Sequence, residues 1–365
     1  MGGQRALIVA TSQTPADVGR EIRKGTHYRI DYLELSARLK ATYIDYRAVG
    51  GGRVARAIED RLRLDLRQAV QAARIAERQR CEVVLCMSER VGLGMSALPL
   101  PRMRHIIQFH HPMSRRKLQL IKALGLQHRW SLALVPSSAE ARAFSAALGL
   151  PPGRVRVLNP SPIDLDFFAP SHDRPRAEIR PHVLSAGLSH RDYPCLLRAL
   201  RMIPHVRCDL RAGSAWTAGQ GALDGEEVPP NVHLRPFVRP HVLRDCYSAA
   251  RFIVVPIRPT TQWSAGCTTV LHAQAMGKAV IASAVPGLHD FLEHGKTGLL
   301  VPPDDPEALA RAIDELWSDP RRAAEMGRRA RAWVESGFSL DRWLDTVSTA
   351  MAEEDLGDPV LARAG

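Results

Sequence analysis

The sequence has no long hydrophobic run. Hydrophobic residues make up 45% of the 365 residues and charged residues 24%, which is the balance of a soluble globular protein. No apolar stretch approaches the roughly 18 residues that a membrane span requires. The first one, Ala6 to Ala10, has five residues and predicts a β-strand rather than a signal peptide. We therefore expect no membrane-spanning segment and a cytoplasmic location.

Aromatic residues are scarce as well, at 5% of the chain. No basic run is interleaved with stacking aromatic residues, which argues against a nucleic-acid partner. The cysteines show no paired spacing that would indicate a zinc site or a disulfide framework, so we expect reduced, mostly buried thiols and no metal site. The six cysteines are Cys81, Cys86, Cys195, Cys208, Cys246 and Cys267.

Lysine is rare in an otherwise basic chain. The formal net charge is +12, yet only six of the 50 basic residues are lysine, an imbalance typical of codon bias as much as of function. Positive charge still favours an anionic partner, such as a lipid headgroup or a phosphorylated small molecule.

Short apolar runs alternate with longer amphipathic segments and predict parallel strands joined by crossover helices. The first series of expected strands lies at residues 5–10, 41–46, 81–88, 105–110, 132–137 and 155–159. The second lies at 182–187, 206–213, 231–238, 250–257, 278–283 and 297–303. We expect helices over 31–40, 53–80, 193–202 and 265–276, and a helical chain after Pro303.

A stretch rich in proline and charge, "NPSPIDLDFFAPSHDRPRAEIRP", separates the two series and reads as a linker. The sequence thus predicts an α/β protein with two doubly wound, Rossmann-like domains that face a cleft, where such folds bind ligands. The expected divisions are a domain over 1–160, a linker over 161–181, a domain over 182–338, and a helix and tail over 339–365 that we expect to pack back on the first domain.

The stretch "QWSAGCTTVLHAQAMGKAVIAS" predicts a loop of small residues that leads into a helix. Helices begin with unpaired N–H groups and a partial positive charge, so small residues there let an anion such as phosphate approach closely. The alternative is an ordinary N-cap followed by a packing glycine. The residues concerned are Ser264, Ala265, Gly266, Thr268 and Thr269.

About 170 residues of the C-terminal half resemble the nucleotide-sugar-binding domain of GT-B glycosyltransferases, most closely the retaining family four, also described as glycosyl transferases group 1. The resemblance runs from "HVLSAGLSHRDYPCLLRAL" through "AQAMGKAVIASAVPGLHDFLEHGKTGLLVPPDDPEALARAIDELWSD" to "FSLDRW". It implies a nucleoside-diphosphate sugar on the C-terminal domain as co-substrate, no further cofactor, and an acceptor of unknown kind (glycan, lipid or small molecule) on the N-terminal one.

The resemblance also implies roles for individual residues. The helix that begins near Ser264 would direct its N–H groups at the donor diphosphate, where negative charge builds as the sugar leaves. Arg191 stands where the family usually carries lysine and would clamp that charge, and Gly187 would let the backbone approach the phosphates. Phe237 and Val238 would lie near the base.

Two departures from the family pattern change the expected chemistry. The family usually has glutamate at both ends of a nine-residue stretch, and here those positions hold Ser264 and His272. Leu188 likewise replaces a common arginine. Serine and histidine can hydrogen-bond a donor but supply no negative charge toward a cationic sugar. The replacements indicate a divergent donor site, another stereochemical course, or a chain that binds without turnover.

Candidate residues of the N-terminal domain follow its predicted strands. His110 or His111 ends the strand at 105–110 and would act as hydrogen-bond donor or proton shuttle, with a buried or solvated loop histidine as the alternative. Glu89 is either a general base or, as the alternative, a helix N-cap or a surface carboxylate. Together with Arg191 and His272, the two histidines are the candidate catalytic residues. The acceptor-side candidates besides Glu89 are Thr11, Ser12 and Gln13.

The segment "MSRRKLQLIKALGL" is amphipathic and basic, which suits peripheral contact with anionic lipid at the inner membrane face or an ordinary half-buried helix. The hypothesis from sequence is a metal-independent, retaining glycosyltransferase that uses a nucleoside-diphosphate sugar. The alternatives are a sugar-nucleotide-binding pseudoenzyme that serves as an assembly partner, and a nucleotide-sugar epimerase or hydrolase on the same fold.

Overall fold

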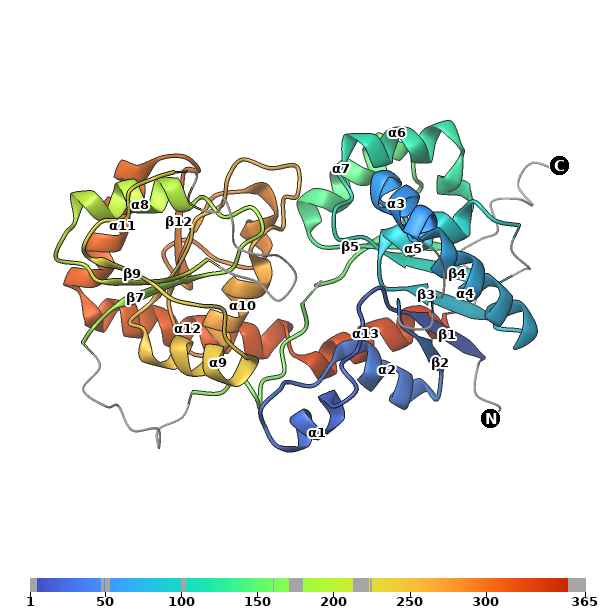
Figure 1. Cartoon of the computed structure of the whole chain (residues 1–365), viewed down its shortest axis with the longest axis horizontal. Helices are drawn as coiled ribbons and strands as arrows, with labels where there is room; N and C mark the ends of the chain where they lie inside the picture. Colours follow the sequence, from blue (N-terminus) through green and yellow to red (C-terminus); the bar gives the residue numbers. More distant parts are fainter. Residues whose placement is uncertain are drawn as a thin grey trace. The chain divides into compact units, whose positions relative to one another are not determined.

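The computed structural model describes residues 5–46, 49, 53–99, 103–159, 161–170, 180–212, 223 and 225–353. Residues 171–179 of the predicted linker and 354–365 of the predicted tail lie outside this set. The chain divides into two compact units, each with its own parallel sheet (Figure 1). Unit 1 comprises residues 1–19, 29–160 and 341–365, and unit 2 comprises 20–28 and 161–340.

Unit 1 is built on a six-stranded parallel sheet in the order β2-β1-β3-β4-β5-β6. Its strands are β1 (Ala6–Val9), β2 (Thr42–Ile44), β3 (Val83–Cys86), β4 (Arg104–Gln108), β5 (Leu132–Val135) and β6 (Val155–Val157). Its helices are α2 (Asp31–Leu39), α3 (Arg53–Leu62), α4 (Leu66–Arg78), α5 (Glu89–Ser96), α6 (Arg115–Ala123), the 3₁₀ helix η2 (Leu126–His128), α7 (Ser138–Leu148) and most of α13 (Leu340–Ala352).

Unit 2 carries a second six-stranded parallel sheet, in the order β12-β11-β10-β7-β8-β9. Its strands are β7 (Val183–Ala186), β8 (Cys208–Arg211), β9 (Val232–Leu234), β10 (Ile253–Val255), β11 (Val280–Ser283) and β12 (Gly298–Val301). Its helices are α8 (Tyr193–Met202), α9 (Pro240–Ala249), α10 (Cys267–Ala275), η3 (Pro286–Asp290), α11 (Pro306–Ser318) and α12 (Pro320–Gly337). The division between the units falls inside α1 (Val18–Arg23).

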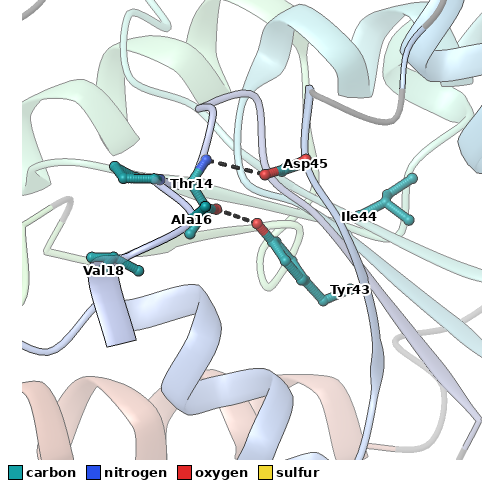
Figure 2. Close-up of a pocket in the computed structure, with 7 residues that line it drawn as sticks. Thr14, Ala16, Val18, Tyr43, Ile44 and Asp45 are labelled. Atoms are coloured by element: carbon teal, nitrogen blue, oxygen red, sulfur yellow. Dashed lines mark hydrogen bonds between the residues drawn. The ribbon is translucent and has the colours of Figure 1, made fainter. Parts of the chain in front are cut away.

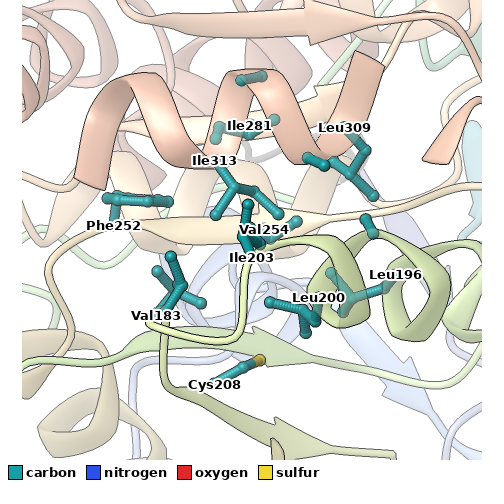
Figure 3. Close-up of a cluster of buried hydrophobic side chains, with 14 of the residues drawn as sticks. Val183, Leu196, Leu200, Ile203, Cys208, Phe252, Val254, Ile281, Leu309 and Ile313 are labelled. Atoms are coloured by element: carbon teal, nitrogen blue, oxygen red, sulfur yellow. The ribbon is translucent and has the colours of Figure 1, made fainter. Parts of the chain in front are cut away.

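Each sheet is apolar on both faces because helices cover both, as expected of doubly wound parallel sheets. In unit 2, one face packs against α8 and α11, and Figure 3 shows Leu200 and Ile313 from these helices turned toward Val254 of the sheet. The other face packs against α10. All twelve strands predicted from the sequence are present, so the predicted α/β fold with two doubly wound sheets is confirmed.

Two predicted helices have different boundaries in the structure. The single helix expected over residues 53–80 is two helices, because Arg63 adopts a left-handed conformation (φ 56°) that ends α3 at Leu62. The helix expected from residue 265 begins only at Cys267, because Gly266 is also left-handed, at φ 87°. Residues 264–266 therefore form a turn that leads into α10.

The chain passes between the units more than once. Residues Arg20–Tyr28 belong to unit 2, where Tyr28 packs against Phe167 and Phe168 of the segment after Ser161. Both phenylalanines are buried in the core there. From Asp341 onward α13 belongs to unit 1, where the Arg104 guanidinium donates to the last carbonyls of that helix.

Candidate functional site

The candidate site of unit 2 lies where its strand order reverses, between β7 and β10. Doubly wound sheets bind ligands at this reversal, outside the carboxyl ends of the strands. Gly187 follows β7, and residues Pro256 and Ile257 follow β10. The two loops are tied together because Arg191 forms a β-bridge with Ile257, and the Asp192 N–H donates to the Pro256 carbonyl at 3.0 Å.

Arg191 is the buried cation of this site, with only 6% of its surface exposed. Its guanidinium donates to the Ala186 carbonyl at 3.2 Å, to the Ser189 carbonyl at 3.1 Å and to the Thr269 hydroxyl at 2.7 Å. Burial lowers the pKa of Arg191 from its usual value, because a charged group loses hydration there. No ion pair to Arg191 occurs among the residues that the structure describes. Within those residues, the guanidinium donates to neutral oxygens only.

Two glycines give the Arg191 side chain its space. Gly187 adopts φ 113°, and a Cβ there would lie 2.7 Å from Nη2 of Arg191. Gly266 adopts φ 87°, and a Cβ there would lie 2.9 Å from Cδ1 of Ile257 and 3.4 Å from Nη1 of Arg191. Only glycine combines this backbone conformation with so close an approach. The loop after β7 and the turn before α10 are thereby brought against the guanidinium.

The first turn of α10 faces the same region. Thr269, in that turn, is the residue that accepts from Arg191. The first N–H groups of a helix have no partner within the helix and carry partial positive charge. One of them, that of Cys267, donates to the Ser264 carbonyl at 3.2 Å. Ser264 is buried in the turn before α10 and does not open the helix as predicted, because the left-handed Gly266 stands between them.

A guanidinium that is buried beside a helix N-terminus, without a carboxylate partner in the described residues, is an arrangement that suits an anion. Burying a charge is costly unless it is paired, and a bound phosphate would pair it. Arginine also matches phosphate oxygens with its planar fork of donors. The site can therefore stabilise negative charge on a phosphorylated ligand.

The other residues predicted for the donor site lie around this centre or farther along unit 2. Ala265 is buried in the same turn, and Thr268 is exposed on α10 with its hydroxyl 2.5 Å from that of Ser161. Phe237 is 52% exposed and Val238 half-buried, both on the loop between β9 and α9. Their predicted contact with a base stays a prediction.

His272, the predicted second donor-site residue of α10, lies in an aromatic cluster. Its ring stacks on Phe168 at 4.0 Å between centroids, with Tyr28 and Tyr247 at 6.1 and 6.4 Å. Burial lowers the pKa of His272 to about 3, so the ring is neutral at physiological pH. The structure gives it a packing role here, and its catalytic role stays a prediction.

In unit 1, the predicted residues Glu89 and His110 meet at the carboxyl ends of β3 and β4. The His110 backbone N–H donates to Oε2 of Glu89 at 3.0 Å, and Lys117 pairs with the other carboxylate oxygen. Burial alone would raise the pKa of Glu89, but Lys117 and His110 outweigh it and hold the pKa at about 2. Glu89 is thus an ionised carboxylate at the start of α5, 3% exposed, that positions the His110 loop.

The bond at its Nε2 orients the ring of His110. Nε2 lies 2.9 Å from the Met87 carbonyl, which can only accept, so Nε2 carries a proton, and in the neutral ring Nδ1 is the acceptor. Asp31, at the start of α2, lies close enough to interact with His110; burial raises the pKa of Asp31 and the histidine opposes the rise. Sequence reasoning missed Asp31 and Lys117. Lys117 lies only seven positions after His110, and a lysine so close could have indicated a partner for Glu89.

The remaining acceptor-side candidates follow β1. Ser12 donates its hydroxyl hydrogen to the Tyr32 hydroxyl at 3.2 Å, Thr11 is half-buried and Gln13 is exposed. His111 is half-buried beside His110. The sequence candidates ended at Gln13 and did not include Thr14. The Thr14 hydroxyl contacts the Tyr32 hydroxyl at 3.1 Å and also that of Tyr43.

Neither a metal cluster nor a membrane span emerges from the described ranges. They hold no group of three or more His, Cys, Asp or Glu side chains placed to share a metal ion. Within the same ranges, no helix combines the length and apolar character of a transmembrane segment. Helix α6 exposes Arg115, Arg116 and Lys122, while Ile121 is buried. Peripheral lipid contact through α6 stays a prediction.

Residues 180–319 match the family model described as Glycosyl transferases group 1. This match confirms the resemblance for most of unit 2, including the loop of Arg191 and the turn before α10. It covers less than half of the chain and does not include unit 1.

Curated relatives are similar over a longer segment. The chain is 32% identical over 243 residues to D-inositol 3-phosphate glycosyltransferase 1 of Catenulispora acidiphila, which is 60% of this chain and 56% of that protein. It is 31% identical over 224 residues to D-inositol 3-phosphate glycosyltransferase of Streptomyces avermitilis, 55% of this chain and 46% of that protein. The chain spans about half the length of the curated relatives it matches.

Solved structures match the whole arrangement of elements. Sucrose-phosphate synthase from Thermosynechococcus elongatus is 19% identical with a TM-score of 0.72 and covers 95% of this chain and 98% of that one. Anabaena HepE, in complex with UDP and glucose, is 16% identical with a TM-score of 0.70 and covers 96% and 100%. At this identity the likeness concerns the fold. The chain therefore has the GT-B fold, and its residues 180–319 match the glycosyl transferases group 1 family.

Proposed function

We propose that the protein is a glycosyltransferase that moves a sugar from a nucleoside-diphosphate sugar to a hydroxyl group of an acceptor. The observation that carries the proposal is the buried Arg191, which donates to Thr269 in the first turn of α10 and has no carboxylate partner in the described residues. The diphosphate of the donor would be the missing counter-charge. The group 1 match over the same residues supports this assignment.

Arg191 and α10 would act on the leaving group. As the bond between the sugar and the diphosphate breaks, negative charge grows on the phosphate oxygens. Donors that are already fixed toward that charge lower the barrier, because they need no reorganisation at the moment of reaction. Arg191 is held by three hydrogen bonds, so it meets this requirement without a metal ion. We therefore propose metal-independent transfer.

On the acceptor side we propose His110 as the group that takes the proton of the attacking hydroxyl. Its Nδ1 is the acceptor nitrogen because Nε2 donates to Met87, and Glu89 fixes the loop through the His110 N–H. A histidine nitrogen that can accept a proton is suited to this work. For the stereochemical course we propose retention, on the resemblance of residues 180–319 to the group 1 family.

For the donor we propose a uridine nucleotide sugar, since HepE, which shares the fold, was solved with UDP and glucose. The names of the curated relatives make an inositol phosphate one acceptor to test.

The test is donor turnover. The purified chain is incubated with UDP-glucose, and released UDP is measured with and without a panel of hydroxylated acceptors. We expect acceptor-dependent release that falls at least about a hundredfold in Arg191→Met, the size reported for removal of one fixed oxyanion donor. The anomer of the transferred or hydrolysed glucose, followed by proton NMR, reports retention or inversion. Conversion that needs no acceptor and yields an isomeric sugar nucleotide would indicate an epimerase instead.

A sugar-nucleotide-binding pseudoenzyme is the second candidate. The observation that favours it is that neither Ser264 nor His272 supplies a carboxylate, and His272 is stacked on Phe168 rather than paired with a charge. This candidate predicts nucleotide binding with no release of UDP, even with enzyme equal in concentration to UDP-glucose. Any acceptor-dependent release that Arg191→Met abolishes would exclude it.

A further inference from the structure

A cavity lies wholly within unit 1, at the carboxyl ends of β1 and β2. Its volume is about 490 Å³, within the range of small-ligand sites. Tyr43 and Asp45 reach it from the end of β2, and Figure 2 shows both turned toward the loop after β1, while the Ile44 side chain points away. The lining residues are Thr14, Pro15, Ala16, Val18, Tyr43, Ile44 and Asp45.

The polar end of this cavity is held rigid by its own hydrogen bonds. The Thr14 N–H donates to Oδ2 of Asp45 at 3.0 Å, and the Thr14 hydroxyl contacts the hydroxyl groups of Tyr43 and Tyr32. The rings of Tyr32 and Tyr43 stack at 5.4 Å with 15° between their planes. Burial raises the pKa of Tyr43 above its usual range, so its hydroxyl stays protonated. A ligand would meet preorganised groups rather than mobile ones.

The charge of the lining limits the class of ligand. Among the lining residues that the structure describes, Asp45 is the only one with a formal charge, and none is a lysine, arginine or histidine. Asp45 accepts from Thr14 and interacts with Tyr43, and a carboxylate can accept several hydrogen bonds, including one from a ligand. It attracts hydroxyl or ammonium donors and repels phosphate. The apolar surfaces of Pro15, Ala16 and Val18 suit the carbon face of a ring.

We propose that this cavity binds a ring compound that carries hydroxyl or ammonium groups and no phosphate, with Asp45 as the hydrogen-bond acceptor that selects it. That this ligand is the sugar acceptor rests on the proposed function, whereas the binding itself does not. The proposal distinguishes this chain from relatives named for a phosphorylated acceptor, because such an acceptor would face Asp45 without a compensating cation among the described lining residues.

Three hexoses that differ in charge test the selection. Saturation-transfer NMR on the full chain compares glucosamine, methyl glucoside and glucose 6-phosphate at equal concentration. We expect glucosamine to bind more tightly than methyl glucoside, and glucose 6-phosphate to bind most weakly. Asp45→Asn, which keeps an acceptor for Thr14, lowers glucosamine affinity by roughly tenfold, the usual worth of a charged hydrogen bond. Ala16→Leu places a larger side chain in the cavity and weakens the binding of all three sugars.

Asp17→Asn is the matched control, because Asp17 is an exposed carboxylate on the same loop that does not line the cavity. It should leave the order of affinities unchanged. Three results would each overturn the proposal. They are no saturation transfer to any of the three sugars, tighter binding of glucose 6-phosphate than of glucosamine, and equal glucosamine binding by Asp45→Asn and the parent. UDP titration of the same samples separates the outcomes: lost UDP binding counts against the proposed function, and lost sugar binding against this site.

Discussion

Gly266 is the residue at which the candidate donor site is most sensitive to a single methyl group. In Gly266→Ala the new Cβ would lie 2.9 Å from Cδ1 of Ile257, 3.1 Å from Cγ1 of Val255 and 3.4 Å from Nη1 of Arg191. The backbone at φ 87° is also unfavourable for alanine. Strain and overlap therefore act together at the start of α10.

The expected loss of stability has two parts. A residue with a side chain in the left-handed region costs about 1–2 kcal/mol. Overpacking of a buried contact costs about 1–3 kcal/mol more. We expect unit 2 to lose about 2–5 kcal/mol in free energy of unfolding. Because Arg191 lies at the edge of the overlap, UDP affinity should fall as well.

Hydrogen exchange of peptides from β10 and α10, measured along a urea series, reports the unfolding of unit 2. Gly295→Ala is the matched control, since Gly295 has φ 78° but nothing within 4 Å of its added Cβ. It carries the strain alone and should cost about 1–2 kcal/mol. Ile257→Val removes the atom that is nearest to the new methyl group and should restore part of the loss in Gly266→Ala. Equal costs for the two alanine variants, and no rescue by Ile257→Val, would refute the reasoning.

Three further variants probe other parts of the account. The pKa of Glu89 is about 2 in the folded chain and near 4.3 in the unfolded chain. Its ion pair with Lys117 therefore stabilises the fold above about pH 4.3, and this stabilisation is lost as the pH falls through 2. In Glu89→Gln, the urea midpoint should depend less on pH between about pH 5 and 2. His272, with a folded pKa of about 3, should stay neutral by NMR from pH 8 to 4, and His272→Phe should remove the loss of stability that appears below about pH 6.5. Arg104→Met removes the donor to the last carbonyls of α13 and should speed amide exchange in that helix alone by roughly tenfold.

The sequence predicted the sheets well because hydrophobic periodicity and turn residues are local signals. It predicted less well where a few backbone angles decide the geometry. Gly266 was predicted inside the first turn of a helix over 265–276, yet its left-handed conformation moves the start of α10 to Cys267 and leaves Ser264 in a turn. Nothing in the residue types fixes the sign of φ at a glycine.

Long-range placement accounts for the other gaps. Tyr28 comes from the first thirty residues, yet it packs against Phe168 and His272 in unit 2. No local pattern links positions so far apart in the chain. Arg191 was found because it occupies a family position, but its three neutral partners and its lack of an ion pair in the described chain came only from the coordinates. Asp45, by contrast, lies near the end of the strand predicted over 41–46 and directly follows β2 in the structure. Polar residues at such strand ends deserve inclusion in any candidate list.

Calorimetric titration at low salt with UDP, GDP, ADP and TDP tests the central claim most directly. We expect one of the four to bind saturably, and Arg191→Met to weaken that binding roughly thirtyfold, which corresponds to about 2 kcal/mol for a charged hydrogen bond to phosphate. Arg198→Met, which changes a half-buried arginine on α8 that pairs with Asp304, is the control and should bind like the parent. If none of the four nucleotides binds, or if Arg191→Met binds as tightly as the parent, then Arg191 and the first turn of α10 are not a diphosphate site.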